Sequence, residues 1–124
     1  MNEDKLETGL EEEGEGQLTV DVYQTPSEFV IESTIAGVDP DDVDVDVTSE
    51  SVTIKGSRKR KRSVTEDDYL YQECFWGKFS RSIILPQEVD PERAESSLKN
   101  GILTIRLPKL HREQTKKLKI KSAE

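Results

Sequence analysis

The dipeptide Asn100-Gly101 constrains the fold of this chain more than any other pair of residues. Asparagine and glycine both tolerate positive φ angles, so together they favour the tight two-residue turn that joins antiparallel strands. After the turn, Leu103, Ile105 and Leu107 alternate with polar residues, which predicts a strand with one buried and one solvated face. The segment therefore predicts a β-hairpin whose second strand ends near Pro108.

Period-two alternation of apolar and polar residues recurs along the rest of the chain. It starts at Leu18, becomes richer in apolar residues over 29–35, and is clearest in the hairpin expected over 43–56. Further strands are expected over 69–73 and 79–85, with a turn at Gly77-Lys78 between them. Roughly eight strands separated by turn signals, without a helical period, predict an all-β protein with an antiparallel β-sandwich.

The chain of 124 residues has room for one domain with two tails. Residues 1–16 are rich in glutamate and predict a short acidic disordered arm, residues 17–109 form the expected sandwich, and residues 110–124 are a basic C-terminal extension. That extension contains Leu118-Lys119-Ile120, in which two branched apolar side chains are separated by one lysine. Such a pair in a charged tail predicts a surface that receives it.

Composition and charge favour assembly with other copies. Hydrophobic residues make up 32% and charged residues 35% of the chain, so the core is expected to be thin or shared with a partner. The first 50 residues carry 16 acidic side chains and one basic one, whereas the remainder carries 10 acidic and 17 basic ones. This asymmetry predicts attraction within or between protomers, and a homo-oligomer of at least two chains.

Several classes of protein are disfavoured. No segment has the roughly 20 apolar residues that cross a bilayer, and the acidic start does not resemble a secretory leader, so we expect a cytoplasmic protein without a membrane partner. Cys74 is the only cysteine and is expected to be a half-buried strand thiol. His111 is the only histidine and lies in the tail, so neither catalysis, a cofactor nor a metal is expected.

Three charged or aromatic features leave alternatives open. The aspartates over 39–46 lack calcium-loop spacing and are interpreted as solvent-facing charges on a strand. The basic run 58–62 is compatible with phosphate binding, but it lacks adjacent aromatic residues, so we favour a solvated loop that faces the acidic half of a partner. Nucleic acid is therefore not expected as a partner. Trp76 is either a binding hot spot or a residue that packs in the core or in the dimer interface.

Four motifs occur in an order that resembles one family. Ala94, Leu98 and Gly101-Ile102-Leu103 are similar to the Ala-x-x-x-Asn-Gly-Val-Leu signature of the small heat-shock proteins, the alpha-crystallin family. Ala36-Gly37-Val38, the run 77–86 and Val89-Asp90-Pro91 are also similar to that family's pattern. The resemblance covers residues 17–109, and Leu118-Lys119-Ile120 resembles the family's C-terminal anchor.

The resemblance implies an immunoglobulin-like sandwich, the alpha-crystallin domain, in an ATP-independent holdase that binds partly unfolded client proteins and prevents their aggregation. It also implies protomers that exchange a loop strand, and an anchor, Leu118 and Ile120, that docks in an apolar groove of another subunit. The groove residues would be Val43, Val45, Val47, Ala94, Ser96 and Leu98; the dimer loop would contain Arg58, Lys59, Arg60, Lys61, Arg62, Val64 and Tyr69; and the signature hairpin would contain Asn100, Gly101, Ile102 and Leu103.

The arm of the chain departs from the family pattern. Members of the family usually have a longer N-terminal arm rich in aromatic residues, whereas residues 1–16 are mostly acidic and contain no aromatic residue. We therefore expect a dimer more firmly than a large cage. The alternative hypothesis is a CS-domain-like co-chaperone or scaffold module that binds one dedicated folded partner. The Leu118-Lys119-Ile120 tail favours the first hypothesis, because such a module has no use for a self-docking anchor.

Overall fold

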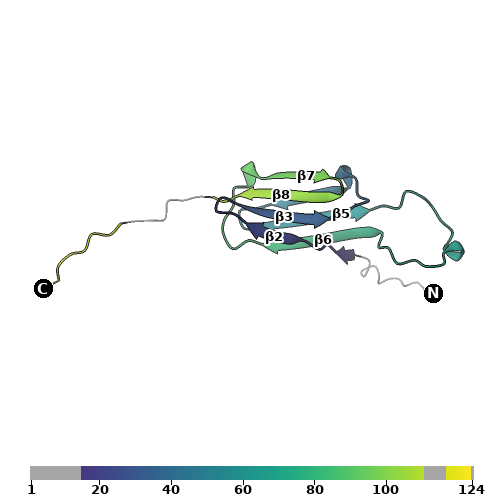
Figure 1. Ribbon diagram of the computed structural model, residues 1–124, viewed down its shortest axis with the longest axis horizontal. Helices are drawn as coiled ribbons and strands as arrows, with labels where there is room; N and C mark the ends of the chain where they lie inside the picture. The colour runs from purple at the N-terminus through teal and green to yellow at the C-terminus, as the bar shows by residue number, and fades with distance from the viewer. Residues whose placement is uncertain (1–14, 111–116, 124) are drawn as a thin grey trace.

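The protein is a sandwich of two four-stranded sheets (Figure 1), seen in a computed structural model that describes residues 15–110 and 117–123. The first sheet has the strand order β1-β6-β5-β4 and the second has the order β2-β3-β8-β7. Every neighbouring pair is antiparallel except β1 and β6, which run parallel. The predicted β-sandwich is therefore confirmed. The strands are β1 (Glu15–Gln17), β2 (Asp21–Gln24), β3 (Glu28–Thr34), β4 (Val43–Val47), β5 (Ser51–Arg58), β6 (Gly77–Ile84), β7 (Glu95–Lys99) and β8 (Ile102–Pro108).

Alternating side chains from both sheets fill the core between them. Leu103, Ile105 and Leu107 of β8 point inward as the sequence pattern predicts, and Val52 and Ile54 face them from β5. All five side chains are buried, so their removal from water is the main source of stability of the sandwich.

The turn between β7 and β8 has the predicted geometry. Asn100 and Gly101 have φ angles of 53° and 79°, and Lys99 pairs with Ile102 on either side of them. Two positive φ angles in a two-residue loop match the twist of the flanking strands. The backbone N–H of Ile35 donates a hydrogen bond of 2.8 Å to the carbonyl of Gly101, which ties this turn to the end of β3.

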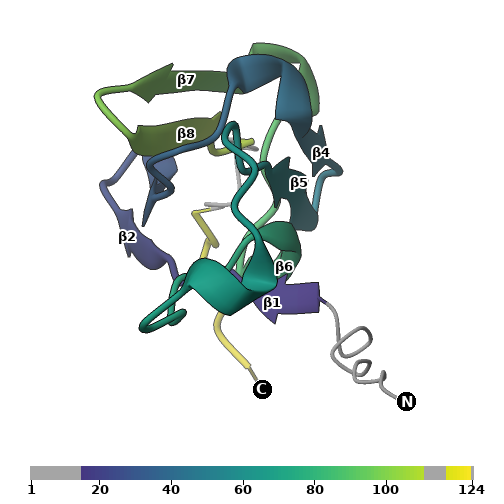
Figure 2. The same ribbon diagram turned by 90° about the vertical axis from the view of Figure 1, so that its right-hand side faces the viewer.

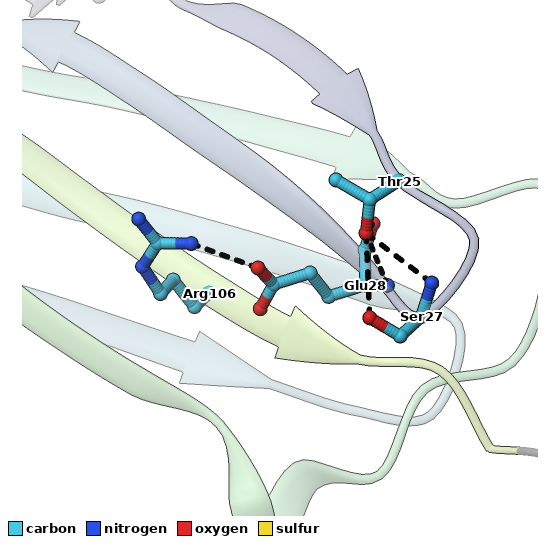
Figure 3. A network of polar contacts seen from close by, with 4 residues as sticks. All are labelled: Thr25, Ser27, Glu28 and Arg106. Atoms are coloured by element: carbon cyan, nitrogen blue, oxygen red, sulfur yellow. Dashed lines mark hydrogen bonds and ion pairs between the residues drawn. The ribbon is translucent and has the colours of Figure 1, made fainter.

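A hydroxyl group closes the turn between β2 and β3 (Figure 3). The Oγ1 atom of Thr25 accepts hydrogen bonds from the backbone N–H groups of Ser27 and Glu28, at 3.2 and 3.1 Å. Glu28 then pairs through its carboxylate with Arg106 on β8, at 2.8 Å. The turn therefore enters β3 in a defined register with β8.

Several predicted strand boundaries are wrong. Residues 69–73 form no strand in the described part of the chain, because the loop that contains them projects beyond the sandwich, where no free strand edge of the protomer meets it (Figure 1). Gly77 and Lys78 begin β6 instead of forming a turn, and the alternation from Leu18 becomes a strand only at Asp21. Strand β1 starts at Glu15, inside the expected arm; it has no apolar alternation and is held by backbone pairing with β6.

The helical content of the described residues is limited to three short 3₁₀ turns. They are η1 (Pro40–Asp42), η2 (Glu66–Asp68) and η3 (Pro91–Arg93), and none is long enough to span a bilayer.

Candidate functional site

Strands β4 and β7 are edge strands of the two sheets and lie on the same side of the sandwich (Figure 2). A groove lies between them. It encloses a cavity of about 260 Å³ lined by Val45 and Val47 of β4 and by Ala94 and Ser96 on the β7 side. Both valines are half-buried while Asp44 and Asp46 point to solvent, because side chains alternate along a strand. The groove is thus lined by valine side chains on its β4 side, and the aspartates of that strand lie on its outer rim.

The groove floor was not anticipated from the sequence. Ile105 lies at its base, with 1% of its surface exposed, and Pro91 of η3 lines one end. Ile105 is the cross-strand partner of Ser96, so the small serine side chain leaves part of the groove empty above it. Ile105 could have been predicted from the register of β7 with β8, because the two-residue turn at Asn100-Gly101 fixes that register.

Two residues expected in the groove lie beside the cavity. Val43 pairs with Gly56, and Leu98 pairs with Leu103; both are partly buried against the core and do not line the cavity. The structure therefore brings four of the six expected groove residues together around one hollow.

The anchor side chains are exposed in the single protomer. Leu118 is 74% and Ile120 is 94% exposed, and the segment 117–123 extends away from the sandwich (Figure 1). Neither lines the groove of its own chain. Their side chains are available to a receiving surface outside the protomer.

Pairing within the protomer accounts for two cations of the basic run. The Nζ atom of Lys59 lies 3.3 Å from the Asp42 carboxylate, and that of Lys61 lies 3.6 Å from Asp39. Arg58 donates a hydrogen bond of 3.0 Å from Nε to the carbonyl of Ala36. Acidic groups of η1 and of the turn before it therefore lie beside these lysines in the same chain, and the expectation that the run faces the acidic half of a partner stays a prediction.

Arg60 has aromatic neighbours that are distant in sequence. Its guanidinium carbon lies 5.1 Å from the ring centroid of Tyr69 and 5.4 Å from that of Trp76. These contacts fold the loop between β5 and β6 (residues 59–76, the β5–β6 loop) around a cavity of about 520 Å³. In the sequence, only the aromatic residues that follow the basic run indicate these contacts with Arg60.

The β5–β6 loop exposes unusual apolar surface. Leu70 is 93% and Tyr71 is 84% exposed, and Val64 is 40% exposed. Cys74 is also exposed in this loop, so the predicted half-buried strand thiol is wrong. It lies outside any strand because no partner edge within the protomer pairs with this segment.

The described residues hold no cluster of three or more histidine, cysteine, aspartate or glutamate side chains arranged to bind a metal ion. His111 lies outside the described residues.

A two-sheet sandwich with an edge groove, a long loop before β6 and an extended tail is typical of an alpha-crystallin domain. A model of the Hsp20/alpha crystallin family matches residues 15–121. The chain therefore belongs to the Hsp20/alpha crystallin family.

Known relatives span kingdoms. Small heat shock protein C4 of Rickettsia felis is 36% identical over 100 residues, which cover 81% of this chain and 61% of that protein. Heat shock protein 16 of Schizosaccharomyces pombe is 36% identical over 106 residues, covering 84% and 74%. This chain thus spans only part of the length of its curated relatives.

Solved structures share the fold. Heat shock protein 16.0 from Schizosaccharomyces pombe superimposes with a TM-score of 0.74 at 34% identity, covering 87% of this chain and 78% of that one. A small heat-shock protein from Xylella fastidiosa gives a TM-score of 0.69 at 28% identity, covering 85% and 96%.

Proposed function

We propose that this protein is a cytoplasmic, ATP-independent holdase that binds partly unfolded client proteins and prevents their aggregation, and that it assembles with itself. The observation that carries the proposal is that one chain has both an open groove between β4 and β7, lined by Val45 and Val47, and the exposed apolar side chains of Leu118 and Ile120. Membership of the Hsp20/alpha crystallin family supports the chaperone role.

The groove suits an extended peptide. Side chains two positions apart on an extended segment point the same way and are roughly 6–7 Å apart, so Leu118 and Ile120 of another subunit can enter together. Full burial of each side chain would contribute about 1.5–3 kcal/mol before ordering costs. One anchor therefore binds weakly and reversibly, and several anchors in one assembly hold it firmly through effective concentration.

The β5–β6 loop supports a second contact, between two protomers. Strand β2 is the outer strand of its sheet, and all four of its residues are exposed, with Val22 at 45% and Tyr23 at 47%. Such an edge accepts a further strand. We propose that loop residues 69–73 pair with β2 of the partner, which would bury Leu70 and Tyr71 and form the dimer.

Light scattering from a reductant-denatured model client tests the holdase function. The intact chain at an equimolar or higher ratio is expected to suppress the rise in scattering, without ATP. An unrelated acidic β-sandwich protein at the same concentration serves as the control. A client that aggregates unchanged at several-fold molar excess of this protein would refute the proposal.

A further inference from the structure

The cavity of the β5–β6 loop combines positive charge with an aromatic wall. One wall is the consecutive run Lys59 to Arg62, and Tyr69 and Trp76 form part of the other. Among the lining residues there are four cations and a single carboxylate, that of Glu73; Lys59 and Lys61 already pair with aspartates of the same chain, which leaves the guanidinium groups of Arg60 and Arg62. Guanidinium groups bind carboxylates strongly, and the aromatic rings offer apolar contact area. The cavity therefore suits an extended segment that carries both carboxylates and aliphatic side chains.

Strand β1 begins at the end of the sandwich where the β5–β6 loop lies. It runs parallel to β6, with Glu15 beside Lys78, and β6 begins at Gly77 where the loop ends. The chain therefore enters β1 at the loop end of the sandwich (Figure 1).

Gly16 also contacts the loop directly. A Cβ atom at Gly16 would lie 2.9 Å from Cε2 of Phe75, so the backbone of β1 lies against this ring. In the sequence, Phe75 lies between Cys74 and Trp76, and both of these neighbours line the cavity. The beginning of β1 and the cavity are thus neighbours.

The residues that precede β1 have the chemistry that the cavity selects. The segment 3–13 carries six carboxylates with one lysine, and it includes Leu6 and Leu10. It lies outside the described residues. A segment of this length spans up to roughly 35 Å when extended, so it can cross the loop from its attachment at Glu15.

We propose that residues 3–13 dock in the β5–β6 loop cavity of their own protomer, with carboxylates against the Arg60 and Arg62 side and a leucine against Tyr69 and Trp76. The acidic segment then acts as a built-in competitor for any other acidic, apolar segment at this surface. Because exposed ion pairs are screened by salt, binding of the acidic segment to the cavity weakens as ionic strength rises. The proposal does not depend on holdase activity, and its test involves no client.

Trp76 is the only tryptophan and reports on the cavity. The test replaces Glu11, Glu12 and Glu13 with glutamine in the full chain and measures acrylamide quenching of tryptophan fluorescence. At low salt the quenching constant is expected to be about twice that of the parent; about 0.5 M NaCl should raise the parent to the same value and leave the variant unchanged. The matched control, Asp44→Asn with Asp46→Asn and Glu50→Gln, removes three exposed charges from the β4–β5 hairpin and should quench like the parent. Equal quenching of the glutamine variant and the parent would overturn the proposal.

Cys74 provides an independent readout because it is the only cysteine and lines the same cavity. A benzophenone maleimide attached to it is expected, after illumination and proteolysis, to yield adducts with residues 3–13. In a mixture of ¹⁵N-labelled and unlabelled protein these adducts should carry one isotope only. Adducts confined to β2, to the C-terminal tail or to mixed-isotope pairs would overturn the proposal in favour of a second copy as the occupant.

Discussion

Gly56 of β5 lies directly opposite Phe79 of β6, and the absence of a side chain at Gly56 lets the phenyl ring lie over the backbone. A Cβ atom at Gly56 would come within 2.6 Å of Cζ of Phe79 and within 2.8 Å of the carbonyl oxygen of Asp42. Phe79 is 3% exposed and belongs to the core. One glycine therefore allows both the packing of this ring and the close approach of η1 to β5.

Gly56→Ala is expected to destabilise the fold by about 1–3 kcal/mol, because neither the buried ring nor the backbone carbonyl can move away without disturbing the core. Denaturant unfolding at fixed protein concentration measures this change in free energy. Lys55→Ala is the matched control on the same strand; since Lys55 is exposed, its effect should stay within about 0.5 kcal/mol. Equal unfolding midpoints for the two variants would contradict the packing argument.

The sequence predicted those parts of the fold that depend on local chemistry. The strands over 43–47 and 102–108 follow from apolar alternation, and the turn at Asn100-Gly101 follows from the two residues that tolerate positive φ. Strand β1 was not predicted, because Glu15-Gly16-Gln17 pairs with β6 through its backbone and has no alternation of apolar and polar side chains. Residues 69–73 carry a strand-like pattern without an edge to pair with in the protomer.

The part of the candidate site that follows from the alternation of side chains along a strand was predictable from the sequence. Val45 and Val47 meet Ala94 and Ser96 because both strands are sheet edges, whereas Ile105 enters the groove through the register of β7 with β8. The contacts of Arg60 with Tyr69 and Trp76 depend on the conformation of a long loop, and the periodic pattern of apolar residues does not predict that conformation.

Thr25→Val is expected to cost about 1 kcal/mol, because it removes the hydroxyl that accepts hydrogen bonds from the N–H groups of Ser27 and Glu28. Since a domain of this size loses roughly 4–8 °C per kcal/mol, circular dichroism melting should show a drop of several degrees in Tm. Thr25→Ser keeps the hydroxyl and should melt close to the parent. A valine variant as stable as the serine variant would show that the turn is held by other contacts.

Leu118→Ala combined with Ile120→Ala is expected to lower the mass of any assembly larger than a dimer, because the proposed docking relies on the apolar area of these two side chains to fill the β4–β7 groove of another subunit. Size-exclusion chromatography with light scattering measures the mass. Lys117→Ala with Lys119→Ala is the matched control in the same tail and should leave the mass unchanged. Ser96→Trp, which fills the groove from the other side, should reproduce the loss; a large assembly that survives both changes would exclude the groove as the docking site.

Leu70→Ser combined with Tyr71→Ser is expected to weaken dimerisation while leaving the protomer folded. Both side chains are more than four-fifths exposed in the single chain, so their removal costs the isolated fold little, whereas in the proposed strand exchange they become buried against β2 of the partner. Sedimentation of a dilution series should show a dimer dissociation constant raised at least about tenfold, which corresponds to about 1.4 kcal/mol. Ile84→Ser is the matched control, because Ile84 is 78% exposed on β6 and lies outside the proposed interface. If the loop variant and the control dimerise equally well, the β5–β6 loop does not form the dimer contact.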